Sequence, residues 1–277
     1  MSTVAEWILE ATNRLKAAGI PSAHLDAELL LAHTLRKPRT WLHGHGDDPI
    51  EDRTNEIASA RLDLRLDRVP VAYIVGHKEF YGRPFKVTTA TLIPRPESED
   101  LIELLETVLP KNERLIVDRP LRLVDVGTGS GNLGITAKLL EPTLQVTLVD
   151  TSRYALTVAE ENAETLGGVV DVLQSDLLAL YPYVADYIIA NLPYVDPKWE
   201  RSPETNHEPE SALFAENDGL ALIFQLIAQT KEKLVRGGWL ILEADPMQHA
   251  AIKKEAAQHG LIIHTIRGYA ILLNKVA

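Results

Sequence analysis

Residues 121–140 read LRLVDVGTGSGNLGITAKLL, in which a buried strand runs into a glycine-rich turn and then into a helix. Gly127, Gly129 and Gly131 let the backbone turn tightly and approach a ligand without side-chain interference. The helix behind them offers free N–H groups in its first turn. Because ligands bind just beyond the carboxyl ends of the strands in open α/β sheets, this stretch predicts a ligand site at a sheet edge.

Strand and helix patterns alternate from about residue 91 to the end of the chain. This alternation is typical of a largely parallel sheet that helices cover on both faces. The last two strand patterns follow one another closely, which predicts an antiparallel pair at the end of the sheet. We therefore expect an α/β domain over residues 91–277.

The first 75 residues carry helical patterns instead. Trp7 and Leu15 fall on one face at helical spacing, and no strand signal precedes Val71. Residues 79–87, EFYGRPFKV, place two phenylalanines around a Gly-Arg-Pro turn, which indicates a β-hairpin. The expected organisation is a helical domain, a hairpin linker and the α/β domain, over residues 1–75, 76–90 and 91–277.

The composition is that of a soluble globular protein, with 45% hydrophobic and 24% charged residues among 277. No window approaches the roughly 18 apolar residues of a membrane span. The N-terminus is helical in pattern and contains acidic residues, unlike a secretory signal. The chain has no cysteine, which excludes disulfides, thiolate metal sites and a cysteine nucleophile. These features predict a cytoplasmic protein without a membrane partner.

The net charge is −11, from 28 basic and 39 acidic residues. Proteins that bind nucleic acid through its phosphates need a basic face, so the charge argues against direct nucleic-acid binding. His43 and His45 lie beside two acids in WLHGHGDD, but no further ligand pattern accompanies them. A solvated loop is the favoured interpretation there, and no metal site is predicted.

The glycine loop alone does not identify its ligand. The NAD fingerprint requires G-x-G-x-x-G, and the third glycine comes one residue early here, although Gly134 leaves a partial match. A Walker A loop would need Gly-Lys-Ser/Thr, which is absent. Asp150 ends the next strand and can accept both ribose hydroxyls of an adenosine. Asp176 ends the strand after that and would meet the adenine edge, with Leu177 packing on the ring. The alternative is a glycine-rich turn with two helix-capping acids.

A second candidate site is the stretch ANLPYVDP, residues 190–197, which directly follows the buried run DYIIA. The side-chain carbonyl of Asn191 can accept one hydrogen of a planar –NH2 group, and the backbone carbonyl of Leu192 can accept the other. Pro193 holds residue 192 extended and so aims that carbonyl. Tyr194 offers a ring for stacking. Such a clamp orients a poorly nucleophilic nitrogen toward a methyl donor; the alternative is a strand-ending turn.

Five stretches resemble the peptide chain release factor glutamine N5-methyltransferases (the PrmC/HemK family), in the same order and over nearly the whole chain. They are FYGRPFKVTTATLIPRPESE, VDVGTGSGNLGI, ANLPYV, HEPESALFAENDGL and GGWLILEADPMQ. The stretch LIPRPESE, residues 92–99, is the most family-specific of them. The resemblance implies a Rossmann-like class I S-adenosylmethionine (SAM)-dependent methyltransferase with a small all-helical N-terminal domain and a β-hairpin linker.

The resemblance also implies that the substrate is the glutamine amide in the Gly-Gly-Gln loop of class 1 release factors, which the helical domain would dock. SAM would be held by Gly127, Thr128, Gly129, Ser130, Gly131, Asp150, Asp176, Leu177 and, near the methyl group, Asn191. The glutamine would be held by Asn191, Leu192, Pro193 and Tyr194, which are the expected catalytic residues. Pro94, Arg95 and Pro96 would lie against the active site, with a structural ion pair as the alternative for Arg95.

Some residues depart from the family pattern. Leu192 stands where the family usually has proline, and Asn-Leu-Pro-Tyr is typical of rRNA adenine dimethyltransferases. Asp245 and Pro246 replace a glycine-containing turn. An adenine N6-methyltransferase acting on RNA or DNA is therefore the alternative function, and a SAM-binding protein without activity is a third. The charge, the helical domain and LIPRPESE favour the glutamine enzyme. His207 and Glu208 suggest a general base, although a structural loop is favoured.

Overall fold

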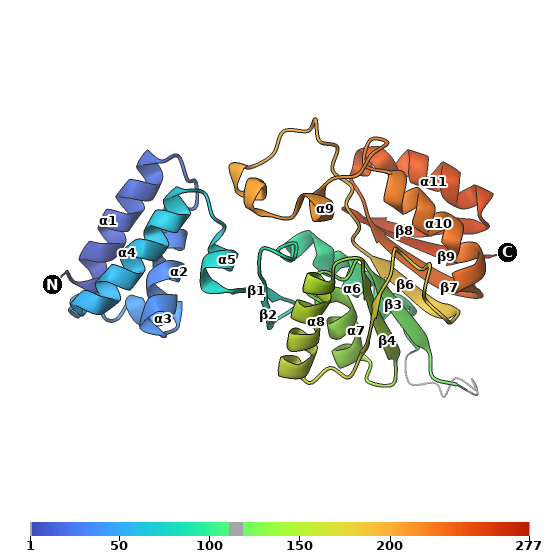
Figure 1. The fold of residues 1–277 in the computed structure, drawn as a ribbon, viewed down its shortest axis with the longest axis horizontal. Helices are drawn as coiled ribbons and strands as arrows, with labels where there is room; N and C mark the ends of the chain where they lie inside the picture. Colours follow the sequence, from blue (N-terminus) through green and yellow to red (C-terminus); the bar gives the residue numbers. More distant parts are fainter. Residues whose placement is uncertain (1, 111–118, 277) are drawn as a thin grey trace. The chain divides into compact units, whose positions relative to one another are not determined.

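The computed structural model describes residues 2–110 and 119–276. Residues 1, 111–118 and 277, which fall within the parts expected to be helical and α/β, lie outside the described residues. The chain divides into two compact units, drawn in Figure 1. The first contains Met1–His77 and Ser202–His207; the second contains Lys78–Arg201 and Glu208–Ala277. Among the described residues, no helix is long and apolar enough to cross a bilayer.

The first unit is built from helices that bury a shared apolar face. These helices are α1 (Val4–Ala17), α2 (Ala23–Leu35), α3 (Arg39–Leu42), α4 (Asp52–Leu66) and α5 (Val71–Val75). Helix α1 begins at a capping box, in which the Thr3 hydroxyl accepts from the Glu6 amide and the Glu6 carboxylate accepts from the Thr3 amide. Trp7 and Leu15 of α1 pack with Leu30 of α2, which explains their helical spacing in the sequence.

A short segment from much later in the chain completes this unit. The 3-10 helix η2 (Pro203–His207) carries Glu204, whose carboxylate accepts hydrogen bonds from Arg65 at 2.9 Å and Arg68 at 3.4 Å. Arg65 is buried and also donates to Asp26 at 2.7 Å. Two carboxylates therefore compensate one buried guanidinium, as a charge removed from water requires.

The hairpin consists of β1 (His77–Phe80) and β2 (Arg83–Lys86). Its two turn residues, Tyr81 and Gly82, both have positive φ, 50° and 72°, which is the backbone that a tight two-residue hairpin turn needs. Phe80 and Phe85 are buried in the core of the second unit. The Asn162 side chain of α8 (Arg153–Leu166) exchanges two hydrogen bonds with the backbone of Lys86 and fixes the hairpin to that helix.

A mixed sheet forms the centre of the second unit, with the order β5-β4-β3-β6-β7-β9-β8 in the described chain. The first five strands in this order are parallel to one another, and β9 is antiparallel to both of its neighbours. The largely parallel sheet and its antiparallel end are thus confirmed. The strands are β3 (Arg122–Val126), β4 (Gln145–Asp150), β5 (Asp171–Gln174), β6 (Ala185–Ala190), β7 (Leu234–Glu243), β8 (Leu261–Arg267) and β9 (Ala270–Lys275).

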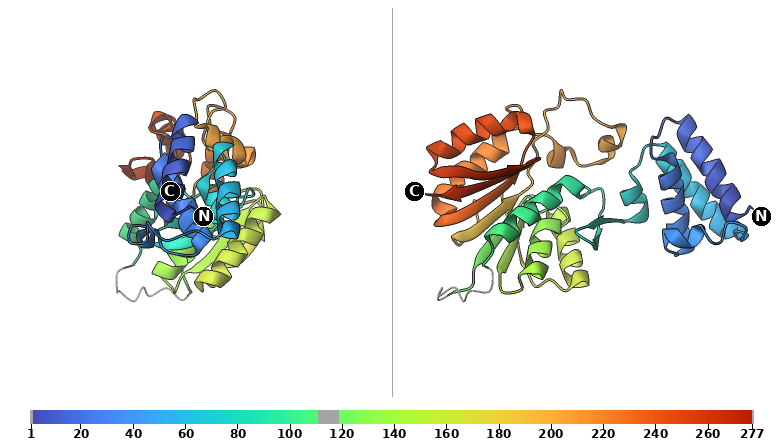
Figure 2. Two further views of the ribbon diagram at one scale, coloured as in Figure 1. Left: turned by 90° about the vertical axis from the view of Figure 1, so that its left-hand side faces the viewer. Right: turned by 180° about the vertical axis from the view of Figure 1, so that it is seen from behind.

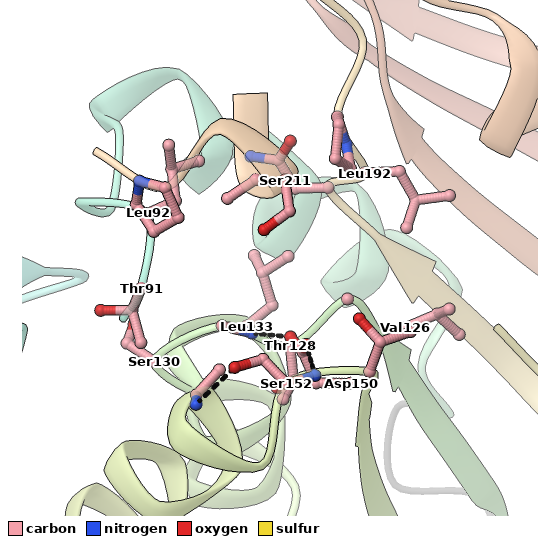
Figure 3. A pocket seen from close by; sticks show the side chains of 18 of the residues that line it. Thr91, Leu92, Val126, Thr128, Ser130, Leu133, Asp150, Ser152, Leu192 and Ser211 are labelled. Carbon is pink, nitrogen blue, oxygen red and sulfur yellow. Dashed lines mark hydrogen bonds between the residues drawn. The ribbon is translucent and has the colours of Figure 1, made fainter. Parts of the chain in front are cut away.

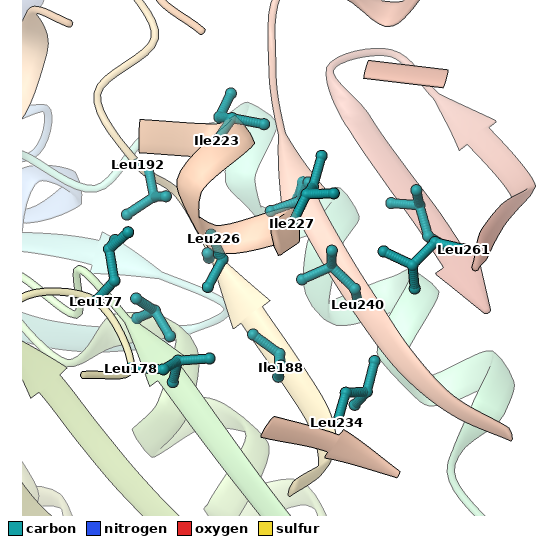
Figure 4. Packing of buried hydrophobic residues seen from close by; sticks show 14 of the residues in the cluster. Leu177, Leu178, Ile188, Leu192, Ile223, Leu226, Ile227, Leu234, Leu240 and Leu261 are labelled. Atoms are coloured by element: carbon teal, nitrogen blue, oxygen red, sulfur yellow. The ribbon is translucent and has the colours of Figure 1, made fainter. Parts of the chain in front are cut away.

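Helices cover both faces of this sheet (Figure 2). The longer ones are α6 (Glu99–Val108), α7 (Asn132–Leu140) and α8 (Arg153–Leu166) on one face, and α10 (Ala221–Lys233) and α11 (His249–Gln258) on the other. Side chains alternate along each strand. Leu123 therefore packs in the hydrophobic cluster beneath α6, α7 and α8, while Val124 and Val126 pack in the cluster beneath α10 and α11. Figure 4 shows the cluster beneath α10 and α11, where Ile188 and Leu240 of the sheet contact Leu226 and Ile227 of α10.

The register of the parallel strands determines where the site lies. Val126 pairs with Val149 on one side and with Ala190 on the other, and Ala190 pairs with Leu242. The residues that follow these positions consequently meet at one edge of the sheet. From β3 the chain first adds β4 and β5 on one side and then places β6 on the other side. Open α/β sheets bind ligands at the carboxyl edge next to such a reversal of strand order.

Candidate active site

The glycine-rich loop lies between β3 and α7 and is held by the end of β4. Gly127, Gly129 and Gly131 all have positive φ, 71°, 55° and 81°, a backbone that residues with a side chain rarely adopt. The amides of Gly127 and Thr128 donate to the carbonyl of Val149 at 2.8 and 2.9 Å. These contacts tie the loop to the neighbouring strand and keep its remaining groups directed toward the sheet edge.

Asp150 connects the loop to the next helix. Its Oδ2 accepts from the Gly129 amide at 3.0 Å, and its Oδ1 accepts from the Ser152 amide at 2.8 Å. An ionised carboxylate has about four lone-pair sites, so each oxygen retains the capacity for a further donor. The carbonyl of Asp150 accepts from the Ser175 amide, which places Asp176 and Leu177 beside it.

A pocket at this edge brings together residues from both candidate sites. Its lining contains twelve of the fifteen site residues expected from the sequence: Pro94, Arg95, Gly127, Thr128, Gly129, Ser130, Asp150, Asp176, Leu177, Asn191, Leu192 and Pro193. Gly131, Tyr194 and Pro96 are not among its lining residues. In Figure 3, Leu92 and Ser211 lie on one side of the pocket, and Ser152 and Asp150 lie on the other.

The side chain of Asn191 is held by a hydrogen-bonded network that begins in the pocket lining, to which Asn191 and Ser98 both belong. Its Nδ2 donates to Oγ of Ser98 at 2.9 Å, and this hydroxyl donates to Oε2 of Glu243 at 2.5 Å. The hydroxyl of Tyr194 donates to Oε1 of the same carboxylate at 3.0 Å. Burial raises the pKa of Glu243, and hydrogen bonds from Ser98, Tyr194 and Asn191 oppose that rise. Burial and the adjacent Glu243 raise the pKa of Tyr194, so its hydroxyl keeps its hydrogen.

Leu192 has a structural environment that the sequence did not reveal. Its side chain is 4% exposed and belongs to the same core cluster as Leu177 and Leu226 (Figure 4). It also lies against the glycine loop, since a Cβ placed on Gly127 would stand 2.9 Å from its Cδ2. The side chain therefore packs the loop and the corner together.

The turn after β7 supports the same corner from behind. Asp245 begins the 3-10 helix η3 (Pro246–Gln248) with a capping box, in which its Oδ1 accepts from the Met247 amide at 2.8 Å. The side-chain Nε2 of Gln248 then donates to the carbonyl of Tyr194 at 2.9 Å and to that of Asp218 at 2.7 Å. A turn without glycine is thus closed by its own side chains and holds the backbone of the corner.

Arg95 and Glu208 form an ion pair, with 2.6 Å between Nη2 and Oε1. The second oxygen of Glu208 accepts from the Ile93 amide at 3.2 Å, and its side chain is 2% exposed. Glu208 is consequently engaged in holding the segment before η1 (Pro96–Ser98), which does not suit a general base. Arg95 both lines the pocket and makes this structural contact.

Four residues of this region were not identified from the sequence: Ser98, Gly219, Glu243 and Gln248. All of them stand inside the motifs quoted above, in PESE, AENDGL and LEADPMQ. Their position inside these motifs indicates that they belong to the site, but no spacing in the sequence indicates which residues they contact. Ser98, for example, lies 93 positions before Asn191 in the chain.

The sheet order, the loop after β3 and the polar corner after β6 define the fold of the class I methyltransferases. Two family models match the chain: the PrmC N-terminal domain over residues 6–76 and the methyltransferase small domain over residues 102–208. Both agree with the fold, in which helices precede a methyltransferase sheet. The protein is a methyltransferase.

Several curated relatives narrow this class. The release factor glutamine methyltransferase of Deinococcus radiodurans is 36% identical over 258 residues, covering 92% of this chain and 90% of the relative. That of Escherichia coli K12 is 34% identical over 255 residues, covering 90% and 88%. That of Coxiella burnetii is 38% identical over 230 residues, covering 79% and 78%. The chain belongs to the release factor glutamine methyltransferase family.

Solved structures with low sequence identity share the fold. A methyltransferase from Pyrococcus furiosus matches with a TM-score of 0.51 and 17% identity, covering 78% of this chain and 95% of that one. The hMettl16 catalytic domain, solved in complex with the MAT2A 3'UTR hairpin 1, matches with a TM-score of 0.52 and 16% identity, covering 84% of this chain and 83% of that one. The similarity to these proteins concerns the architecture of the sheet and its helices.

Proposed function

We propose that this enzyme transfers a methyl group from SAM to the side-chain amide N5 of the glutamine in the GGQ motif of class 1 peptide chain release factors. The observation that carries the proposal is that Asp150 and Asn191 line one pocket. Asp150 suits a ribose and Asn191 suits an amide, and both lie at the edge where α/β sheets bind ligands. Family membership supports the choice of substrate.

The residues around the glycine loop fit SAM. Asp150 retains acceptor capacity for two ribose hydroxyls after binding the Gly129 and Ser152 amides. Asp176 lies beyond it for the adenine edge, and Leu177 contributes an apolar surface for the ring. When bound, SAM supplies a methyl group activated by its positive sulfonium. The glycine loop, with Thr128, Ser130 and Gly131, would accommodate the remainder of the cofactor.

The corner after β6 fits a primary amide. Because the Nδ2 of Asn191 is engaged by Ser98, its Oδ1 is the group left to accept a hydrogen from the substrate –NH2. The carbonyl of residue 192 accepts the other hydrogen, aimed by Pro193. Two acceptors orient the nitrogen and favour its pyramidal form, which is catalysis by positioning and preorganised electrostatics. No base is needed before attack, because the nitrogen becomes acidic once it is alkylated.

The ring of Tyr194 takes a supporting role in this proposal. Its hydroxyl is directed to Glu243, and its backbone carbonyl is held by Gln248. It therefore stiffens the end of the clamp. Pro94, Arg95 and Pro96 belong to the segment before α6 that would bound the substrate's path.

The helical unit is proposed to dock the release factor, with residues 1–75 as the recognition domain, 76–90 as the linker and 91–277 as the catalytic domain. The PrmC N-terminal model over residues 6–76 supports this division. We also propose that the enzyme works in the cytoplasm, as its composition predicts.

Adenine N6-methylation of RNA or DNA is the second candidate, and Leu192 is the observation that favours it. Incubation with methyl-labelled SAM and either a class 1 release factor or rRNA distinguishes the two. We expect label on the glutamine of the release factor and none after that glutamine is replaced by glutamate. Label on RNA with an unlabelled release factor would establish the second function instead. SAM binding without transfer to either would show an inactive corner.

A further inference from the structure

We propose that Glu243, acting through Ser98, is a positioning residue that fixes the rotation of the Asn191 amide. In this arrangement the oxygen of Asn191, rather than its nitrogen, faces the pocket. The inference rests on the proposed role of Asn191 as an acceptor for the substrate amide. It assigns a function to two buried residues: Ser98, which lines the pocket, and Glu243, which is not among its lining residues.

The rotation of this amide determines whether the clamp works. The two ends of an asparagine amide have nearly the same shape, but one accepts and the other donates hydrogen bonds. Which end points where is set by the surrounding hydrogen-bond network. If the Asn191 amide were turned by 180°, an –NH2 group would face the substrate –NH2, and two donors cannot bond to each other.

Ser98 selects the correct rotation because its single hydrogen is already engaged. Its hydroxyl donates to Oε2 of Glu243 at 2.5 Å, so its oxygen is available only as an acceptor. The Nδ2 of Asn191 lies 2.9 Å from this oxygen and donates to it. In the turned amide two acceptor oxygens would face each other at that distance, which leaves buried polar groups unsatisfied.

Glu243 is placed to be an acceptor at both of its oxygens. It ends β7, its side chain is buried, and the Tyr194 hydroxyl donates to its other oxygen at 3.0 Å. Two donors thus converge on one buried carboxylate and partly compensate for its removal from water.

The variant Glu243→Gln tests this relay because glutamine has the same shape but carries a donor. Its –NH2 group can donate to Ser98, which frees the Ser98 hydrogen to point at Asn191 and favours the turned amide. We expect kcat to fall at least tenfold, while the Kd for SAM stays within about threefold, because Asp150 and the glycine loop are untouched. A kcat within threefold of wild type, in a variant whose thermal unfolding matches wild type, would overturn the proposal.

Ser98→Ala removes the relay without altering the carboxylate, and we expect a loss in kcat of at least threefold. Adding Glu243→Gln to Ser98→Ala should cost less than Glu243→Gln costs alone, since residues in one network are not additive. If Glu243→Gln does not fold, Ser98→Ala decides alone: an unchanged kcat refutes the relay. Glu106→Gln is the matched control. It alters an exposed hydrogen bond of 2.7 Å that the Tyr81 hydroxyl donates to the Glu106 carboxylate, and it should leave kcat within twofold.

Asn191→Ala, measured alongside, separates this inference from the proposed function. If Asn191→Ala retains wild-type activity, the amide clamp itself is wrong. If Asn191→Ala is inactive while Glu243→Gln and Ser98→Ala are both fully active, the clamp stands and only the relay is refuted.

Discussion

Gly219 lies directly against the backbone of Tyr194: a Cβ placed on Gly219 would stand 1.9 Å from the Tyr194 carbonyl oxygen. The same carbonyl accepts the hydrogen bond from Gln248. The φ of Gly219 is 80°, so the position requires glycine both for its conformation and for its closeness to the corner.

Gly219→Ala is therefore expected to displace the clamp. We predict at least a tenfold loss in kcat/KM, measured with a release factor substrate, together with a lower melting temperature. The control is Gly167→Ala: Gly167 has a similar φ of 78° and nothing within 4 Å of the added atom. Both changes carry the left-handed strain of about 1–2 kcal/mol, but only the first moves the corner. Equal losses in the two variants would show that strain alone is responsible.

Asn191→Ala removes the side-chain acceptor of the clamp. One preorganised hydrogen bond to a reacting group is worth about 3–4 kcal/mol, so kcat should fall about a hundredfold or more. The fold should be retained, as measured by circular dichroism and thermal unfolding. Asn274→Ala, which removes an amide bonded to backbone carbonyls of β7, is the control with unchanged kcat. Retention of more than a tenth of wild-type kcat in Asn191→Ala would contradict the two-acceptor clamp.

Asp150→Asn tests the cofactor site. The neutral amide accepts at only one end, so either the Gly129 or the Ser152 amide loses its acceptor, and the ribose loses one as well. We expect the Kd for SAM, measured by calorimetry, to rise at least tenfold. Asp171→Asn, an exposed aspartate at the start of the neighbouring strand β5, should leave this Kd unchanged. An unaltered Kd in Asp150→Asn would place the ribose elsewhere.

Leu192→Pro restores the residue that the family usually has at this position. The proposed working group is the backbone carbonyl, so kcat should stay within about threefold of wild type. The smaller ring gives up part of the contact with Gly127, at a stability cost of about 1 kcal/mol in urea unfolding. A hundredfold loss of activity would mean that the leucine side chain has a direct part in substrate binding.

Asp125 makes a specific contribution to the pH dependence of stability. Burial raises its pKa to about 6, against the opposing hydrogen bonds from Thr128 and the Gly134 amide. The folded state therefore binds this proton more tightly than the unfolded chain, and the contribution to stability falls as the pH rises from about 4 to about 6. Relative to Asp125→Asn, wild type should lose on the order of 2 kcal/mol of unfolding free energy across this range. Parallel pH curves for the two proteins would contradict this assignment.

The main lines of the fold follow from local patterns. Alternation of strands and helices after residue 91 predicts the parallel sheet, because a strand buried on both faces requires helices on both sides. The glycine loop and Asp150 could be placed at one edge because parallel strands end together there. Asn191 follows the same rule, as the residue directly after β6.

The supporting residues could not be predicted in the same way. Ser98 meets Asn191 and Glu243 only through the folded sheet, and the sequence separations are 93 and 145 positions. Leu192 is a further case, since its position in an active-site motif conceals a packing role. Contacts of this kind depend on the register of β6 against β7, which no short stretch of sequence encodes.

The return of η2 to the helical unit has a consequence for exchanging parts between relatives. Glu204 pairs with Arg65 across 139 positions of the chain. A fragment that ends at residue 77 leaves this guanidinium with Asp26 alone and without the segment that carries Glu204, so it should be less stable than the complete unit. A chimaera that takes its helices from one relative should therefore take residues 202–207 from the same source. The two segments belong to one compact unit and have to match each other.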